Sequence, residues 1–357
     1  YEDGVLGTLD DYYFFTALDG NRYKVYPGYV NQSGNNTGDK IFFTQDDTYV
    51  KPSTIIKVIE NAIPAEITVI DDYAFYGCAN LENFNLYSAD DSSSNETLTK
   101  IGNYAFAGCS SLTEITIPYR VSDYGDYIFL DATSLSKVTF NATDIFNVEE
   151  IAKGMFKNCI RLHDIQFYSD SETPLAINTF ADTVVKIGEE AFMNTKADPS
   201  VLVETSDTKL HDFVFSNNLT TIASHAFKNS DLEEVTLPAS LTTIGVELFE
   251  GSAIQTITFN GTITAIPNGL FKDAESLANI YFYDNGTMLG RNELPAYLET
   301  IGSEAFYNTG LTTLDLSSAT GLISIGDYSF AYSDLVTITI STKQCIWKGC
   351  ICFIGVN

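Results

Sequence analysis

Cysteines are the most reactive side chains in this sequence, and their spacing gives the first indication of chemistry. Six are present. Cys78, Cys109 and Cys159 each follow a phenylalanine by three residues, in a slot that seven other segments fill with Ala, Ser or Thr. A slot restricted to small side chains indicates a tight, inward-facing turn. We therefore expect these three thiols to be buried and unreactive.

A second group of cysteines, Cys345, Cys350 and Cys352, lies within eight residues of sequence. The group is compact enough for a disulfide or a metal site. Its C-x₄-C-x-C spacing, with no histidine nearby, matches no zinc-binding pattern. A disulfide within the group remains open and would leave one thiol free.

Histidines and carboxylates form no catalytic pattern. The three histidines, His163, His211 and His225, lie in different segments, and no nucleophile elbow, P-loop or dinucleotide-binding motif is present. Three aspartates between residues 123 and 131 could contribute to calcium binding, but they lack the spacing of an EF-hand loop. We therefore expect a protein that is not an enzyme and that needs neither a cofactor nor a metal.

Charge and hydropathy narrow the choice of partners. Acidic residues outnumber basic ones 47 to 19, which gives a net charge of −28. Nucleic acid and anionic membranes would be repelled by such a surface. No run of eighteen apolar residues exists, so no membrane-spanning helix is expected. The chain opens at Tyr1 without a basic segment followed by an apolar one, so we expect it to carry no signal peptide.

The elements that position these side chains come from one short repeated unit. Residues 98–118 read LTKIGNYAFAGCSSLTEITIP, and the same pattern recurs along most of the chain. Where copies abut, their spacing is 22 residues, and elsewhere insertions at 88–97, 169–183, 196–218 and 284–297 lengthen it. One phenylalanine per copy marks the register: Phe75, Phe106, Phe129, Phe156, Phe192, Phe227, Phe249, Phe271, Phe306 and Phe330.

Each unit has two halves that cannot fold alone. The half L-x-x-I-x-I predicts a short strand whose isoleucines point to the same side, as Ile115 and Ile117 do. The half I-x-x-x-A-F, as in Ile101 to Phe106, has the spacing of one helical or 3₁₀ turn. Stacked copies bury each other's apolar faces, which predicts a repeat solenoid with a parallel sheet along one side.

The intact unit at 101–118 resembles the BspA-like leucine-rich repeats of bacterial and protist surface proteins. The resemblance covers roughly residues 55–341. It implies a leucine-rich-repeat right-handed superhelix, with a parallel β-sheet on one face and short helical or 3₁₀ turns on the other. It also implies a secreted or cell-surface location and adhesion to host or matrix proteins.

Three regions are expected along the chain. Residues 1–54 alternate aromatic and polar side chains around the turn sequence DGN at 19–21, which predicts a small β-rich N-terminal cap. Residues 55–341 form the solenoid of about ten units. Residues 342–357 are a C-terminal tail or cap and contain the only tryptophan, Trp347.

The face of the sheet opposite the core is the candidate binding surface. It is defined by the residue between the two inward positions of each strand and the residue after the strand. These positions are rich in Thr and Tyr, which also favour strands without any ligand. Exposed tyrosines are nevertheless typical anchors for protein or sugar ligands. The candidate residues are Tyr87, Thr116, Thr139, Gln166, Tyr168, Thr236, Thr258, Tyr281, Tyr283 and Asp315.

Three functions are consistent with these patterns. The first is a non-enzymatic cell-surface or secreted adhesion protein that engages an extracellular, host or matrix protein through the sheet face and the adjacent insertions. The second is a structural spacer within a larger surface protein. The third is a glycan-binding module, which the exposed tyrosines would suit.

Overall fold

A computed structural model of the chain describes residues 13–17, 22–25, 67–82, 84, 86, 97–141, 148–169, 173–196 and 212–340. The chain divides into two compact units: Tyr1–Thr183 with Asp198–Lys209, and Val184–Ala197 with Leu210–Asn357. Tyr87, most of the N-terminal cap predicted at 1–54 and all of the tail at 342–357 lie outside the described residues. So do most of the insertions at 88–97 and 196–218.

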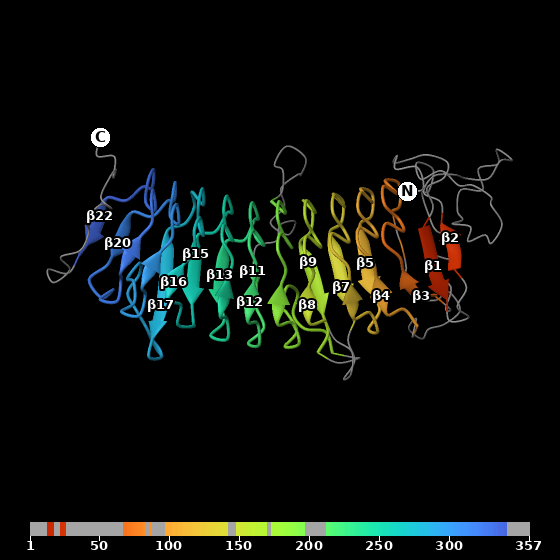
Figure 1. Cartoon of the computed structure of the whole chain (residues 1–357), viewed down its shortest axis with the longest axis horizontal. Helices are drawn as coiled ribbons and strands as arrows, with labels where there is room; N and C mark the ends of the chain where they lie inside the picture. Colours follow the sequence, from red (N-terminus) through yellow and green to blue (C-terminus); the bar gives the residue numbers. More distant parts are fainter. Residues whose placement is uncertain are drawn as a thin grey trace. The chain divides into compact units, whose positions relative to one another are not determined.

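The first unit consists of stacked coils that contribute one long and one short strand each (Figure 1). The long strands β5 (Glu114–Ile117), β7 (Lys137–Phe140) and β9 (Asp164–Phe167) pair in parallel. The short strands β4 (Lys100–Ile101) and β6 (Asp123–Tyr124) continue in parallel from β3 (Ile67–Ile70), and β8 (Glu150–Ile151) belongs to the next coil. A hairpin of β1 (Tyr13–Ala17) and β2 (Arg22–Val25) pairs antiparallel with β3.

The second unit repeats this plan. The ladder equivalent to the long strands contains β11 (Asp212–Phe213), β13 (Glu234–Leu237), β15 (Thr256–Phe259) and β17 (Asn279–Asp284), all parallel, although only two residues of β11 pair. Strand β18 (Thr287–Met288) returns antiparallel to β17. Further along, β20 (Thr313–Asp315) pairs in parallel with β22 (Thr337–Thr339). The short parallel strands are β10 (Lys186–Ile187), β12 (Thr221–Ile222) and β14 (Thr243–Ile244), then β16 (Ala265–Ile266), β19 (Thr300–Ile301) and β21 (Ser324–Ile325).

The helical or 3₁₀ turns expected around each repeat phenylalanine are not found, since the described residues contain no helix. The residues two before and two after each of these phenylalanines have positive φ, as Tyr104 (55°) and Gly108 (74°) do around Phe106. A left-handed residue interrupts a right-handed helical run. The chain therefore makes tight turns whose N–H groups bond to the next coil: Phe75 donates to the carbonyl of Ala105 at 2.7 Å.

Phenylalanine rings stack in columns through the core of each unit. In the first unit Phe106 stacks on Phe75 at 5.0 Å between ring centroids. In the second, Phe249 stacks on Phe227 at 5.8 Å and on Phe271 at 5.9 Å. The repeat register inferred from the spacing of the phenylalanines is therefore confirmed: equivalent phenylalanines of successive coils stack on one another.

The small slot is buried after nine of the ten phenylalanines, as predicted for an inward-facing turn, and is partly exposed at Ser333. Cys78, Cys109 and Cys159 are buried free thiols. The Cys109 and Cys159 thiols donate to the carbonyls of Phe75 and Phe129, at 3.2 and 3.1 Å. Burial raises the pKa of Cys78 to about 12 and raises the pKa of Cys109 and Cys159 as well. These thiols therefore stay protonated and unreactive at neutral pH.

Candidate functional site

The sheet face of the first unit brings three predicted residues into one row. Thr116 on β5 lies directly beside Thr139 on β7, which lies beside Gln166 on β9. All three are partly exposed, while the residues on either side of each along the strand are buried. The alternation follows from the two-residue period of a strand, which sends successive side chains to opposite faces.

The second unit has the corresponding row. Thr236 on β13, Thr258 on β15 and Tyr281 on β17 are neighbours in the parallel register. Thr236 is exposed and the other two are partly exposed. Asp315 lies further along this unit, where it pairs with Thr339 on β22 and forms a bridge with Glu293. Besides its threonines, the predicted face of this unit therefore carries an aromatic ring and a carboxylate group.

Tyr168 and Tyr283, predicted to follow the strands, mark the bases of two hairpins. Tyr168 forms an antiparallel bridge with Pro174, and Tyr283 pairs antiparallel with Met288. The described parts of the insertions at 169–183 and 284–297 thus fold back along the strands that precede them. The hydroxyl of Tyr297 donates to the carbonyl of Tyr283 at 2.8 Å, which fastens the end of the second insertion to β17.

Two asparagines that sequence reasoning missed hold these hairpins in place. The Asn292 side chain accepts from the Ile280 amide at 2.7 Å and donates to the Ala278 carbonyl at 3.1 Å. In the first unit, Asn178 accepts from Ile165 at 2.9 Å and donates to His163 at 2.8 Å. Each side-chain amide thereby takes the place of a peptide group in the ladder. Both asparagines have positive φ in the structure. In the sequence they share only one feature, which is an aliphatic residue three positions earlier.

Gln166 has a structural role as well as a place on the face. Its amide donates to the carbonyls of Phe167 at 2.8 Å and Leu175 at 2.7 Å, which ties the first hairpin to β9. Both amide hydrogens are therefore engaged, and the side-chain oxygen is the group that a ligand would meet.

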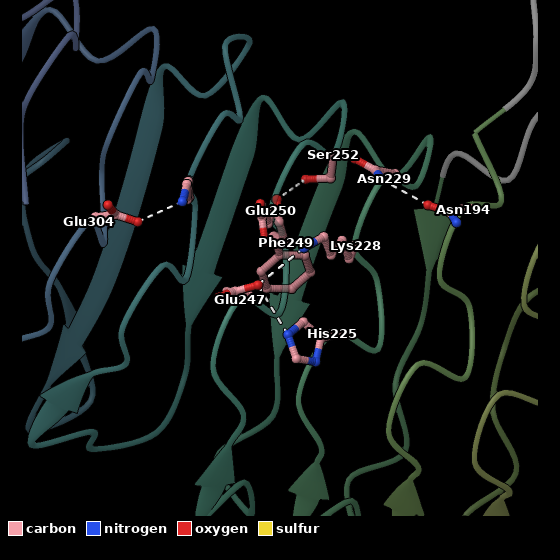
Figure 2. A network of polar contacts seen from close by, with 10 residues as sticks. Asn194, His225, Lys228, Asn229, Glu247, Phe249, Glu250, Ser252 and Glu304 are labelled. Atoms are coloured by element: carbon pink, nitrogen blue, oxygen red, sulfur yellow. Dashed lines mark hydrogen bonds and ion pairs between the residues drawn. The ribbon is translucent and has the colours of Figure 1, made fainter.

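A polar network lies on the turn side of the second unit (Figure 2). Lys228 contacts both Glu247, at 3.1 Å, and Glu250, and His225 contacts Glu247 at 3.1 Å. Because the carboxylates belong to the coil after that of Lys228, these contacts join successive coils. A hydrogen bond with Glu250, together with Lys228, lowers the pKa of Glu247 to about 2, while burial raises the pKa of Glu250.

This network has the character of an inter-coil brace. Lys228 contacts both carboxylates, and a single lysine–glutamate contact of the same kind joins Lys272 to Glu304 at 2.6 Å. Asn229 similarly donates to Asn194 at 2.8 Å in the preceding coil (Figure 2). The side-chain pairs therefore link neighbouring coils.

The other residues considered for chemistry are dispersed. Asp123 pairs with Lys100 at 2.8 Å, and Asp131 accepts a hydrogen bond from Asn158 at 2.6 Å. Within the described part of the chain, no three His, Cys, Asp or Glu side chains gather as metal ligands would. His163 contacts Asp164 at 3.0 Å, whereas His211, Cys345, Cys350 and Cys352 lie outside the described residues.

Stacked coils with one parallel strand ladder per face, a phenylalanine column and an exposed Thr and Tyr row define a leucine-rich-repeat β-solenoid. The chain belongs to the family of the BspA type leucine rich repeat region, whose pattern matches residues 53–197, 205–293 and 283–354 in six copies. The family resemblance inferred from the unit at 101–118 is thus confirmed.

The chain is similar to several solved leucine-rich-repeat structures, and one of them, with a TM-score above 0.5, supports the same fold. A leucine-rich repeat protein from Bacteroides ovatus is 18% identical with a TM-score of 0.53, over 95% of this chain and 89% of that chain. One from Eubacterium ventriosum is 16% identical with a TM-score of 0.46, over 95% and 96%. A leucine rich cell surface protein from Faecalibacterium prausnitzii is 22% identical with a TM-score of 0.41, over 96% and 97%. No curated protein matches the chain in sequence.

No helix that could cross a bilayer occurs in the residues that the structure describes.

Proposed function

We propose that this chain is a non-enzymatic binding module of a secreted or cell-surface protein. It engages an extracellular protein, such as a host or matrix protein, through the exposed sheet face and the adjacent hairpins. The observation that carries the proposal is the tyrosine group of the second unit. Tyr281 and Tyr283 lie two residues apart on β17, on the same side of the strand, where the threonine row meets the β17–β18 hairpin.

The setting of these tyrosines favours binding. Ile280 and Phe282, on either side of Tyr281, are fully buried, so the backbone of β17 is held in place by the core. At the edge of β17 that faces away from β15, the Asn292 side chain accepts a hydrogen bond from the backbone amide of Ile280. A surface that is already ordered loses little conformational entropy when a ligand binds. Tyrosine supplies large contact area with few rotatable bonds, which makes it a frequent hot-spot residue.

The charge around the face favours a particular kind of protein. Asp212 and Glu234, which are neighbours on β11 and β13, are both exposed beside the threonine row. Together with the net charge of −28, they would accelerate the approach of a ligand with a basic patch. Binding should then weaken as ionic strength rises, because surface charges are screened by salt.

The test is binding of the whole chain to purified collagen, laminin and fibronectin by surface plasmon resonance. The double variant Tyr281→Ala, Tyr283→Ala should lose at least about tenfold in affinity, corresponding to about 1.4 kcal/mol for a lost anchor. Tyr332→Ala is the matched control, since it removes an exposed tyrosine away from the sheet face. Equal binding by both variants would refute a role of the face.

The alternative functions predict other outcomes. A glycan-binding module would give no response with the three proteins but would bind sugars on a glycan array, and the Tyr281 and Tyr283 double variant would abolish that signal. A structural spacer would bind neither set of probes. Either result would replace the protein-binding proposal.

A further inference from the structure

The tip of the β17–β18 hairpin carries an Asn–Gly pair in an open turn. Asp284 pairs with Thr287, so Asn285 and Gly286 form a two-residue loop between the strands. Both loop residues have positive φ, 48° and 77°, as a type I′ turn requires. Both are exposed, and a Cβ built on Gly286 would meet no atom within 4 Å. Water therefore has free access to this tip.

The reactive groups of the pair are held only weakly. The middle amides of a two-residue loop lie outside the strand ladder, and among the described residues the Gly286 N–H has no hydrogen-bond partner. The Asn285 side-chain amide donates to the carboxylate of its neighbour Asp284 at 3.0 Å. This bond stays within the exposed turn, where little energy is needed to open it. Motion of the turn alone can therefore bring the Gly286 nitrogen to the side-chain carbonyl carbon of Asn285.

We propose that Asn285 is a site of spontaneous deamidation. The Gly286 nitrogen attacks the side-chain carbonyl carbon of Asn285 and gives up its proton to water, while the side-chain nitrogen takes a proton from water and leaves as ammonia. Water then opens the resulting cyclic imide by breaking one of its two carbon–nitrogen bonds. Cleavage at the side-chain carbon gives aspartate, and cleavage at the backbone carbon gives isoaspartate. Glycine suits the attacking position because it has no side chain to obstruct the approach.

The same dipeptide occurs at 260–261 and 268–269, where the fold protects it. The Asn268 side chain accepts from the Ser303 amide at 2.9 Å, and the buried Gly269 amide donates to the Ser303 carbonyl at 2.9 Å. The other pair is also packed, since Gly261 is buried and its Cβ would lie 3.1 Å from the Ala239 carbonyl oxygen. Reaction at either pair therefore needs local unfolding of a coil first.

Both products change the hairpin. Aspartate places a second carboxylate beside Asp284, and like charges repel. Isoaspartate lengthens the backbone of a loop whose two-residue length fixes the register of β17 and β18. Pairing should therefore loosen at Tyr283, which lies opposite Met288. The deamidation itself does not depend on the proposed binding function.

The experiment incubates the whole chain at mildly alkaline pH and follows the conversion of each Asn–Gly pair from amide to acid by peptide mass spectrometry. Asn285 should convert at least about tenfold faster than Asn260 or Asn268, a difference of about 1.4 kcal/mol in the barrier. In denaturant all three should convert at similar rates, because only the fold distinguishes them. An unchanged Asn285 in the native protein, equal native rates at the three pairs, or the same preference in denaturant would overturn the proposal.

A second measurement tests the effect on the hairpin. Asn285→Gly is the matched control, because a Gly–Gly pair also fits a type I′ turn and cannot deamidate. After incubation, the amides of Asn279–Asp284 and Thr287–Met288 should exchange with deuterium faster in the native chain and at an unchanged rate in the variant. Unchanged exchange in fully converted native protein would overturn the loosening of the hairpin.

Discussion

The phenylalanine column should carry much of the stability of the second unit, and Phe249 is the place to test it. Its ring is fully buried and stacks on two neighbours, with ring planes 9° and 7° from parallel. Phe249→Ala should cost about 3–5 kcal/mol in the free energy of unfolding, because it removes a large buried side chain and leaves a cavity. The two lost ring contacts are part of this cost, at about 0.5–1.5 kcal/mol each.

Phe249→Leu separates stacking from burial. Leucine fills most of the space but offers no ring, so this variant should lose about 1–3 kcal/mol, the share of the two aromatic contacts. Both values are measured by urea unfolding followed by far-UV circular dichroism, with the slope against denaturant checked for loss of cooperativity between coils. A loss below about 1 kcal/mol for Phe249→Ala would refute the reasoning, as would equal losses for the two variants.

Three further predictions test the turns, the ionic brace and the thiols. Gly245→Val should destabilise by at least about 1–3 kcal/mol in urea unfolding, since a Cβ at Gly245 would lie 2.2 Å from the Ser224 backbone nitrogen. The pKa of Glu247 is lowered from about 4.5 to about 2, so the stability it contributes is present above pH 4.5 and is lost as pH falls toward 2. Glu247→Gln should therefore be less stable than the native protein at pH 6 in thermal unfolding, and equal stabilities there would contradict the brace with Lys228. Cys109, whose pKa is raised by burial, should react with iodoacetamide at pH 8 only after unfolding, as peptide mass spectrometry would show.

The fold could be predicted because its signal is repeated. One phenylalanine, one small slot and one pair of inward strand residues recur in each unit, so a single register explains Phe106, Cys109 and Ile115 together. The rows on the sheet face followed from strand alternation alone. Thr116 lies beside Thr139, and Thr258 beside Tyr281, in the register that the repeats imply.

The turns could not be predicted in the same way, because their conformation depends on pairing between coils. The spacing of Ile101, Ala105 and Phe106 fits one helical turn. Positive φ is uncommon for residues other than glycine, so the sequence gives no reason to expect it at Tyr104. Its amide instead donates to the carbonyl of Asp126 in the next coil at 2.9 Å. The glycine after the repeat isoleucine is explained by the same stacking, since a Cβ on Gly102 would lie 2.5 Å from the amide nitrogen of Asp72.

The hairpins were hidden for a related reason. An insertion rich in polar residues looks like a loop in sequence, and no pattern shows that Asn292 will return to bond both Ile280 and Ala278. The same solution, built by Asn178 in the first unit, occurs where Tyr168 follows the strand. Both asparagines thus fix a strand whose end carries a candidate tyrosine. A tyrosine anchors a ligand best when its backbone is already ordered. These two side-chain amides therefore order the strands that carry the candidate tyrosines, just as the stacked phenylalanines order the core.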